Sequence, residues 1–170
     1  PGKIKFGAGT KGTRQHLDCV RLEQAAGIKF QTVHAGSDAS PVVMLAGGHL
    51  DVVQESVGDF ENLVRSGELR ILGVWDDKES PMAPGVKTMK AQGYDLISGA
   101  SRGLAAPAGT PDEIIKVLDA SITKAMDTAD FKEGMAKLKQ PIRHMNTAEY
   151  VAYWRNLETM LQSLMPLVLK

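Results

Sequence analysis

Ile4-Lys5-Phe6-Gly7-Ala8-Gly9-Thr10-Lys11-Gly12-Thr13, residues 4–13, is the stretch that decides the predicted fold. A short apolar strand beginning at Ile4 enters a loop of glycines and hydroxyl residues, and residues 14–26 are then a run of helix formers. Gly27 follows that run, and glycine is the residue that most readily takes the left-handed conformation ending a helix. A strand that passes through a glycine-rich loop into a helix is typical of an α/β fold.

The same succession occurs twice more along the chain. A strand predicted at residues 29–33 precedes a short helix at 42–46, and a strand at 50–53 precedes a helix from 57 to 66. Three strand–loop–helix units in a row indicate an open sheet with helices packed on it.

The three loops are the candidate binding site. The carboxyl ends of parallel strands lie at one edge of a sheet, where helix N-terminal N–H groups and the positive ends of helix dipoles converge. Such an edge suits a carboxylate or phosphate held mainly by neutral donors. The last residue of each loop is expected to cap the next helix, and the hydroxyl groups expected to add donors are those of Thr10, Thr13, Ser37, Ser40 and Ser56.

The remaining residues no longer follow the strand–loop–helix pattern. Residues 69–75 are predicted to form a buried strand, 88–92 a helical turn or two, and β character returns around 102–107. Thr110-Pro111-Asp112-Glu113 has the pattern of a capping box with Pro111 as the first helical residue. Thr147 is expected to open a last helix that Pro166 ends. We therefore expect residues 1–101 to form an α/β unit and the final helices to pack elsewhere.

Composition excludes several classes of function. The chain has 170 residues, 20 Lys plus Arg against 20 Asp plus Glu, and so lacks the cationic field that binding to nucleic acid needs. No apolar run approaches the roughly 18 residues of a membrane span. A single cysteine cannot form an internal disulfide, and the spacing of the histidines indicates no metal site. No cofactor is expected.

Catalytic interpretations are weaker than structural ones. Gly7 to Gly12 has the spacing of a dinucleotide-binding loop, but His34 stands where that motif needs an acidic residue. Cys19 lies mid-helix among apolar neighbours and is expected to be a small core residue. His16 is expected to be a packed or capping residue, and His49 has no partner acid at a catalytic spacing. The sequence therefore predicts a protein that is not an enzyme and has no catalytic residues.

Five segments in order resemble the Bug family, the extracytoplasmic receptors of tripartite tricarboxylate transporters. The family has a Gly-Ser-x-x-His-Leu turn, followed by a Tyr-Lys-Gly-(Ser/Ala) and Leu-x-Gly-Gly-x-Val-Asp pair. It then has a Gly-Lys-x-Arg-x-Leu-Ala-Val strand, a Pro-x-Val-Pro-Thr segment followed by Glu-x-Gly-Tyr, and a Trp-(Arg/x)-Gly-x-x-Ala-Pro-x-Gly-Thr-Pro segment. The similar segments here are residues 12–17, 33–37 with 45–51, 66–74, 84–94 and 102–111.

The resemblance implies a type II periplasmic-binding-protein fold, in which two lobes clamp the ligand. Residues 1–101 would then be the second lobe, and residues 102–170 a crossover strand and C-terminal helices belonging to the first lobe. It also implies that a secretion signal lies in a missing N-terminal part, that the protein is periplasmic, and that this half alone binds weakly or self-associates.

The family's ligand loops carry over residue by residue. The implied function is capture of a small carboxylate and its delivery to the membrane subunits of a tripartite tricarboxylate system, with no bond made or broken. His34-Ala35 departs from the Tyr-Lys that is common in the family, and Thr13 replaces its usual serine. The ligand-binding residues implied are Thr10, Gly12, Thr13, Gly36, Ser37, Ala39, Gln54 and Ser56.

Two other classes of function stay open at this point. One is a cytoplasmic effector-sensing domain of a transcription regulator with a related two-lobed fold. The other is an α/β enzyme acting on a phosphorylated substrate, for which Lys11 or His16 would be essential to turnover.

Overall fold

The computed structural model describes residues 2–36 and 40–168. The chain divides into two compact units, one formed by Pro1–Ala100 with Gln162–Lys170 and the other by Ser101–Leu161. None of the helices in the described ranges combines the length and apolar character needed to cross a membrane.

The first unit is built on a small parallel sheet. Its strands are β1 (Lys5–Ala8), β2 (Gln31–His34) and β3 (Val52–Val53), in the order β2-β1-β3. Phe6 pairs with Thr32 on one side and with Val52 on the other, so β1 is the central strand. The three predicted strands of this unit are confirmed, with shifts of one or two residues at their ends.

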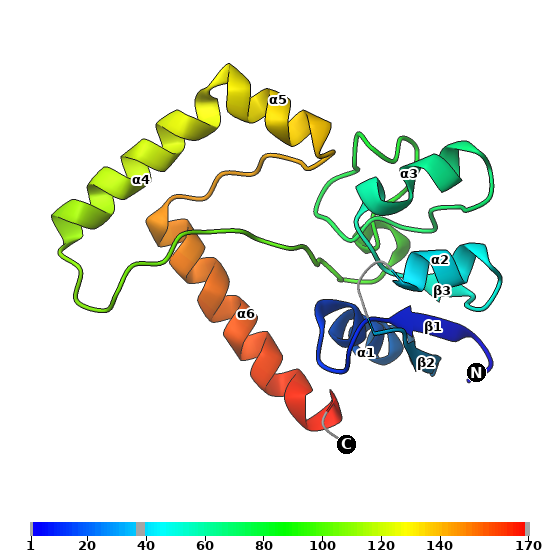
Figure 1. Ribbon diagram of the computed structural model, residues 1–170. Coiled ribbons are helices and arrows are strands. Elements are labelled where there is room, and N and C mark those ends of the chain that lie inside the picture. The colour runs from blue at the N-terminus through cyan, green and yellow to red at the C-terminus, as the bar shows by residue number, and fades with distance from the viewer. Residues whose placement is uncertain (1, 37–39, 169–170) are drawn as a thin grey trace. The chain divides into compact units, whose positions relative to one another are not determined.

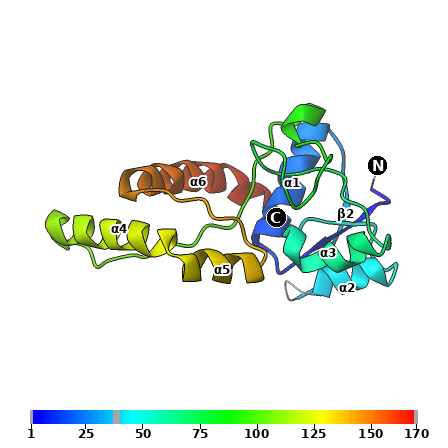
Figure 2. The ribbon, with the colours of Figure 1, turned by 90° about the horizontal axis from the view of Figure 1, so that it is seen from above.

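Three helices follow these strands. They are α1 (Arg14–Ala26), α2 (Ser40–Ala46) and α3 (Val57–Arg65). α1 has the predicted bounds, and Gly27 ends it in the left-handed conformation (φ 63°) with its N–H donating to the carbonyl of Glu23. Figures 1 and 2 show α1 on one side of the sheet and α2 on the other. Right-handed connections place them so, because the chain passes from β1 to β2 and then back to β3.

The core of this unit lies around β1. Phe6 is 1% exposed, and its ring centroid is 5.3 Å from that of Phe30. Gly7 has room for no side chain, since a Cβ there would overlap side-chain atoms of Leu50 and Val53. The other buried apolar residues of the unit are Ala8, Leu17, Cys19, Val42, Leu50, Ala83, Leu96, Leu164 and Val168.

The strand predicted at residues 69–75 is wrong. The structure has there only an isolated parallel bridge between Val74 and Thr88. The side-chain amide of Gln92 donates to the carbonyl of Leu72 at 3.1 Å, which takes the place of a neighbouring strand. The helical turn predicted at 88–92 is confirmed as a short 3₁₀ helix, η1 (Lys90–Gln92).

The second unit is helical. It contains α4 (Asp112–Asp127), α5 (Ala129–Lys137) and most of α6 (Thr147–Val168), whose last turns belong to the first unit. α5 was not predicted. The β character expected at 102–107 gives no strand, because that segment pairs with no other.

Two predictions about the ends of these helices are corrected. The hydroxyl of Thr110 donates to the carbonyl of Pro107 at 2.8 Å, and α4 has no side-chain cap. A capping box occurs instead at the start of α6, where Asn146 and Glu149 exchange backbone-to-side-chain hydrogen bonds of 2.9 and 3.0 Å. Pro166 lies inside α6, which continues to Val168.

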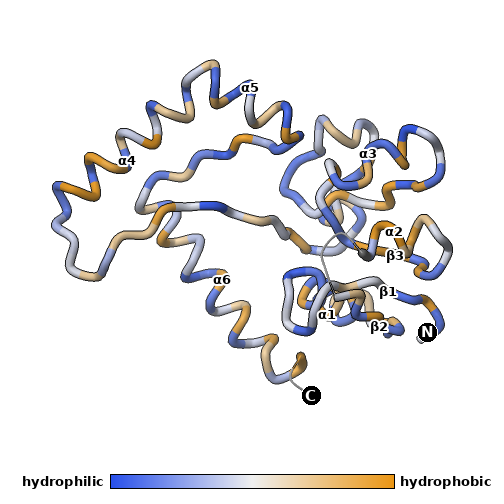
Figure 3. Tube along the Cα trace, viewed as in Figure 1, coloured by the Kyte–Doolittle hydropathy of each residue, from blue (hydrophilic) through white to orange (hydrophobic). Residues whose placement is uncertain are grey.

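Residues 101–161 include no buried residue. Apolar side chains are exposed on the helices, including Val117 at 65% and Trp154 at 52%, and Figure 3 shows hydrophobic positions along α4. The assignment of residues 102–170 to a first lobe stays a prediction.

Candidate functional site

Three loops meet at the carboxyl edge of the sheet. The loop after β1 lies between the loops that follow β2 and β3, because β1 is the central strand and all three strands are parallel. The edge predicted from the sequence is therefore present in the structure, and α1, α2 and α3 begin at it (Figure 1).

The central loop is joined to the loop after β2. The hydroxyl of Thr10 donates to the carbonyl of Gly36 at 3.4 Å, and the N–H of Ala35 donates to the carbonyl of Ala8 at 2.9 Å. The Nδ1 atom of His34 lies 3.0 Å from the carbonyl oxygen of Gly9. These contacts fix the spacing of the two loops.

His16 supports the loop after β1 by a hydrogen bond to its backbone. Its Nδ1 atom accepts the N–H of Gly12 at 3.0 Å, and its ring packs edge-on against His34 with centroids 4.7 Å apart. Burial lowers the pKa of His16 below its usual range, and the nearby His34 and Lys11 lower it further. An accepting Nδ1 requires the neutral ring, so hydrogen bonding and electrostatics agree. His16 is buried, as the packed interpretation predicted.

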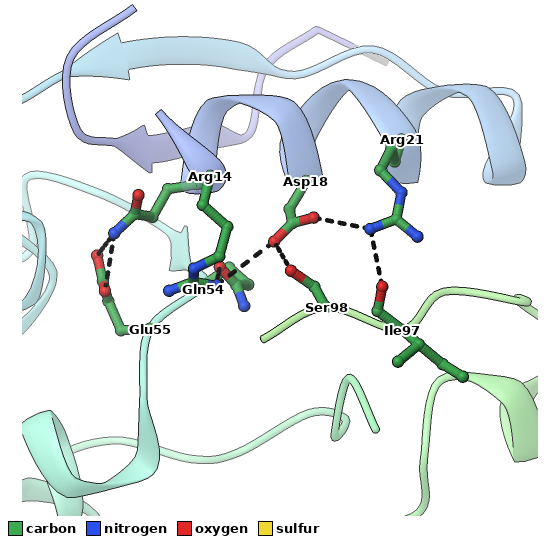
Figure 4. A network of polar contacts seen from close by, with 8 residues as sticks. Arg14, Asp18, Arg21, Gln54, Glu55, Ile97 and Ser98 are labelled. Atoms are coloured by element: carbon green, nitrogen blue, oxygen red, sulfur yellow. Dashed lines mark hydrogen bonds and ion pairs between the residues drawn. The ribbon is translucent and has the colours of Figure 1, made fainter. Parts of the chain in front are cut away.

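The central loop is also joined to the loop after β3 (Figure 4). Arg14, the first residue of α1, donates from Nη1 to Oε1 of Gln54 at 2.6 Å. The Nε2 amide of Gln15 donates to both carboxylate oxygens of Glu55, at 3.1 and 3.3 Å. The first turn of α1 thus holds the third loop by two side-chain contacts.

Asp18 is the buried centre of this network. It is 2% exposed, and it pairs with Arg21 at 3.0 Å and with Arg14 at 3.5 Å. It also accepts the hydroxyl of Ser98 (Figure 4). Burial raises the pKa of Asp18, while Ser98 and the two arginines oppose that rise. The network ties α1 to the segment around residue 98.

Six of the predicted site residues lie in these loops. Thr10, Gly12, Thr13, Gly36, Gln54 and Ser56 are described, whereas Ser37 and Ala39 lie outside the described residues. Gly12 has φ 87°, a conformation that glycine adopts without strain. The structure brings Thr10 to Gly36 and adds Arg14 as the partner of Gln54.

The prediction that hydroxyl side chains cap the helices is corrected. Thr13 and Ser56 occupy the N-cap positions of α1 and α3, but neither makes a side-chain cap hydrogen bond. The hydroxyl of Thr13 donates instead to the carbonyl of Thr10 at 2.8 Å. Ser40 is the first residue of α2 and not the residue before it.

Arg14, Gln15 and Glu55 were missed as parts of this edge. Arg14 and Asp18 are four residues apart and Asp18 and Arg21 three, so their ion pairs could have been found from helical spacing. The contacts with Gln54 and Glu55 are long-range and leave no such signal in the sequence.

The candidate nucleophile is a core residue, as predicted. Cys19 is fully buried, and burial raises the pKa of its thiol to about 11. His49 lies in the exposed turn after α2. Within the described ranges, no three His, Cys, Asp or Glu side chains come together as a metal site would require.

Comparison with known proteins gives the family. A family model described as "Tripartite tricarboxylate transporter family receptor" matches residues 1–159. The chain belongs to this family. The "UPF0065 protein in gbd 5'region" of Cupriavidus necator is 30% identical over 153 residues, which are 90% of this chain and 46% of the relative. The chain thus spans about half the length of that curated relative.

Solved structures show the same fold. A TctC solute-binding protein from Polaromonas, solved without ligand, matches with a TM-score of 0.86 and 25% identity over 97% of this chain and 57% of its own. The periplasmic binding protein BugD matches at 0.75 with 22% identity over 97% of this chain and 56% of its own. An R. palustris protein solved with adipate matches at 0.71 with 19% identity over 98% of this chain and 55% of its own. The resemblance to the Bug family and the periplasmic-binding-protein α/β fold are confirmed.

Proposed function

We propose that this chain is part of a solute-binding receptor that captures a small carboxylate and delivers it to a tripartite tricarboxylate-type membrane transporter. The observation that carries the proposal is the meeting of three strand–helix loops at one edge of the sheet, in a chain of this receptor family. The adipate-bound relative supports a carboxylate as the class of ligand.

The loops suit binding of an anion, with no covalent bond made or broken. The N-termini of α1 and α3 face this edge with no side-chain cap, so their dipoles and their first N–H groups are available to an anion. The predicted contact residues on the described loops are small or neutral. In this proposal the ligand is held by hydrogen bonds from Thr10, Gly12, Thr13, Gly36, Gln54 and Ser56, together with Ser37 and Ala39.

In this proposal the two parts of the chain belong to different lobes of a two-lobed receptor. Residues 1–101 form the second lobe and residues 102–170 belong to the first, so a ligand is clamped only when both lobes are present. The absence of buried residues in 101–161 supports this, since those helices then pack on the rest of the receptor. The chain on its own is expected to self-associate through their apolar faces.

The cellular compartment that we propose is the periplasm. Family members such as BugD are periplasmic binding proteins, so we propose a periplasmic receptor exported by a signal preceding this chain. Its proposed partners are the membrane subunits of the transporter.

A thermal-shift screen tests the function. Small mono-, di- and tricarboxylates are added to this chain and, in parallel, to the complete receptor that contains it. A ligand that binds the folded state raises the unfolding midpoint by mass action. We expect a rise in the complete receptor and little or none in the isolated chain.

Two results would contradict the proposal. A rise with phosphorylated compounds and none with carboxylates would favour an enzyme acting on a phosphorylated substrate. A DNA-binding helix-turn-helix encoded upstream in place of a secretion signal would favour a sensor of a transcription regulator.

A further inference from the structure

Two arginines share one buried carboxylate beside the site, and they share it unequally. Arg21 lies 3.0 Å from Oδ1 of Asp18, and the hydroxyl of Ser98 donates to Oδ2. Arg14 is 3.5 Å from Oδ2, which that hydroxyl already occupies. Asp18 therefore neutralises Arg21 better than Arg14, because ion-pair energy falls with distance.

The second contact of Arg14 leaves its charge in place. Its Nη1 atom donates to the amide oxygen of Gln54 at 2.6 Å, and an amide is neutral. Both contacts use Nη1, so the Nη2 and Nε hydrogens have no hydrogen-bond partner among the residues that the structure describes. The Arg14 side chain is 27% exposed, so part of it is open to a ligand.

The position of Arg14 matches the candidate site. It follows Thr13 directly as the first residue of α1, and its guanidinium touches Gln54 on the neighbouring loop (Figure 4). A guanidinium presents N–H groups in a rigid fork that fits the two oxygens of a carboxylate. Gln54 and Asp18 hold the Nη1 end of that fork and orient the rest.

We propose that Arg14 pairs with a carboxylate of the ligand and makes the receptor select acids over their neutral amides. This inference rests on the proposed function of the same edge. Arg14 is then the positively charged residue of a site whose other predicted contacts are neutral. Gln54 is a positioning residue that holds Arg14.

Calorimetry on the complete receptor tests the proposal. The probes are adipate, succinate and citrate, with the corresponding neutral amides. The variants are Arg14→Met and Arg14→Lys, with Arg21→Met as the matched control. Arg21 pairs with the same aspartate from the same helix, but its other contact is the carbonyl of Ile97 at 2.9 Å, away from the loops.

We expect Arg14→Met to weaken binding of the best acid by about 10- to 100-fold, the range for loss of hydrogen bonds to a charged group. Binding of the amide should change by less than about threefold, so that the preference for acid over amide falls. Arg14→Lys should recover part of the loss, since lysine keeps the charge without the fork. Arg21→Met should weaken binding of the acid clearly less than Arg14→Met does, because it removes no hydrogen-bond donor to the ligand and only leaves Asp18 to pair with Arg14 alone.

Two results would overturn this proposal while leaving the proposed function in place. One is that the wild-type receptor binds an acid probe and Arg14→Met binds it with unchanged affinity. The other is that Arg14→Met and Arg21→Met lose equal affinity, which would mean that Arg14 has a structural role. A wild-type receptor that binds no carboxylate in the thermal-shift screen overturns the proposed function as well.

Discussion

Gly7→Ala is the substitution whose effect follows most directly from the packing. Gly7 lies in the central strand β1, one residue before the end of the strand that leads into the central loop of the candidate site. A Cβ at this position would overlap side-chain atoms of Leu50 and Val53 and would lie 3.3 Å from Cβ of Pro41. Three neighbouring side chains would have to move to accept one methyl group.

The magnitude is that of overpacking a buried site. Forcing one methyl group into a packed core typically costs about 1–3 kcal/mol. The φ of Gly7 is not positive, so steric overlap and not backbone strain is the source of the cost. We expect Gly7→Ala to lower the free energy of unfolding of the first unit by that amount.

Urea unfolding followed by tryptophan fluorescence measures it. Trp75 lies in the first unit and Trp154 in the second, so a Trp154→Phe background reports on the first unit alone. Gly99→Ala is the matched control, because a Cβ at Gly99 meets no atom within 4 Å. A Gly7→Ala variant no less stable than Gly99→Ala would refute the packing described around β1.

Three further predictions concern pH, reactivity and capping. The pKa of His16 is lowered in the folded state, so below about pH 6.5 the unfolded state binds more protons than the folded state. The free energy of unfolding should therefore fall on acidification, by up to about 1.4 kcal/mol per pH unit. His16→Asn, which can keep an acceptor for the N–H of Gly12, should flatten this pH dependence in urea titrations at pH 5–7.5. The buried thiol of Cys19, with a pKa of about 11, should react with a thiol reagent at pH 8 only on unfolding, and rapid labelling of the native protein would contradict its burial. Asn146→Ala should destabilise α6 by about 1 kcal/mol, as measured by thermal unfolding, whereas Thr110→Ala should cost less because that residue caps no helix; equal losses would contradict the assignment of the capping box.

Local signals predicted the fold well where neighbours in the sequence decide the structure. The helix at 14–26 has its predicted bounds, because Gly27 ends it through a left-handed turn that only adjacent residues control. The strand expected at 69–75 failed for the opposite reason. A strand needs a partner ladder, and here a single bridge to Thr88 and the side chain of Gln92 supply the contacts.

Capping shows how a motif can be correct in kind and wrong in place. Thr110 has the residue spacing of a capping box, yet its hydroxyl turns back to Pro107. Asn146 and Glu149 have the same spacing and do form the box. The path of the chain before the helix decides between them, and that path is not a local property of the four residues.

The candidate site was predictable in its loops and not in its charges. Strand order places the loops after β1, β2 and β3 at one edge, as the repeated strand–loop–helix pattern predicts. Arg14 escaped notice because its contact with Gln54 joins residues 40 positions apart. His16 was recognised as packed, but its role as acceptor for Gly12 depends on the turn of the loop.

A crystal structure of the complete receptor with its tightest-binding carboxylate would show directly which residues hold the ligand. We expect a carboxylate group within hydrogen-bond distance of the loops at the carboxyl edge of the sheet, beside Thr10, Gly12 and Arg14. A carboxylate bound away from that edge would contradict it.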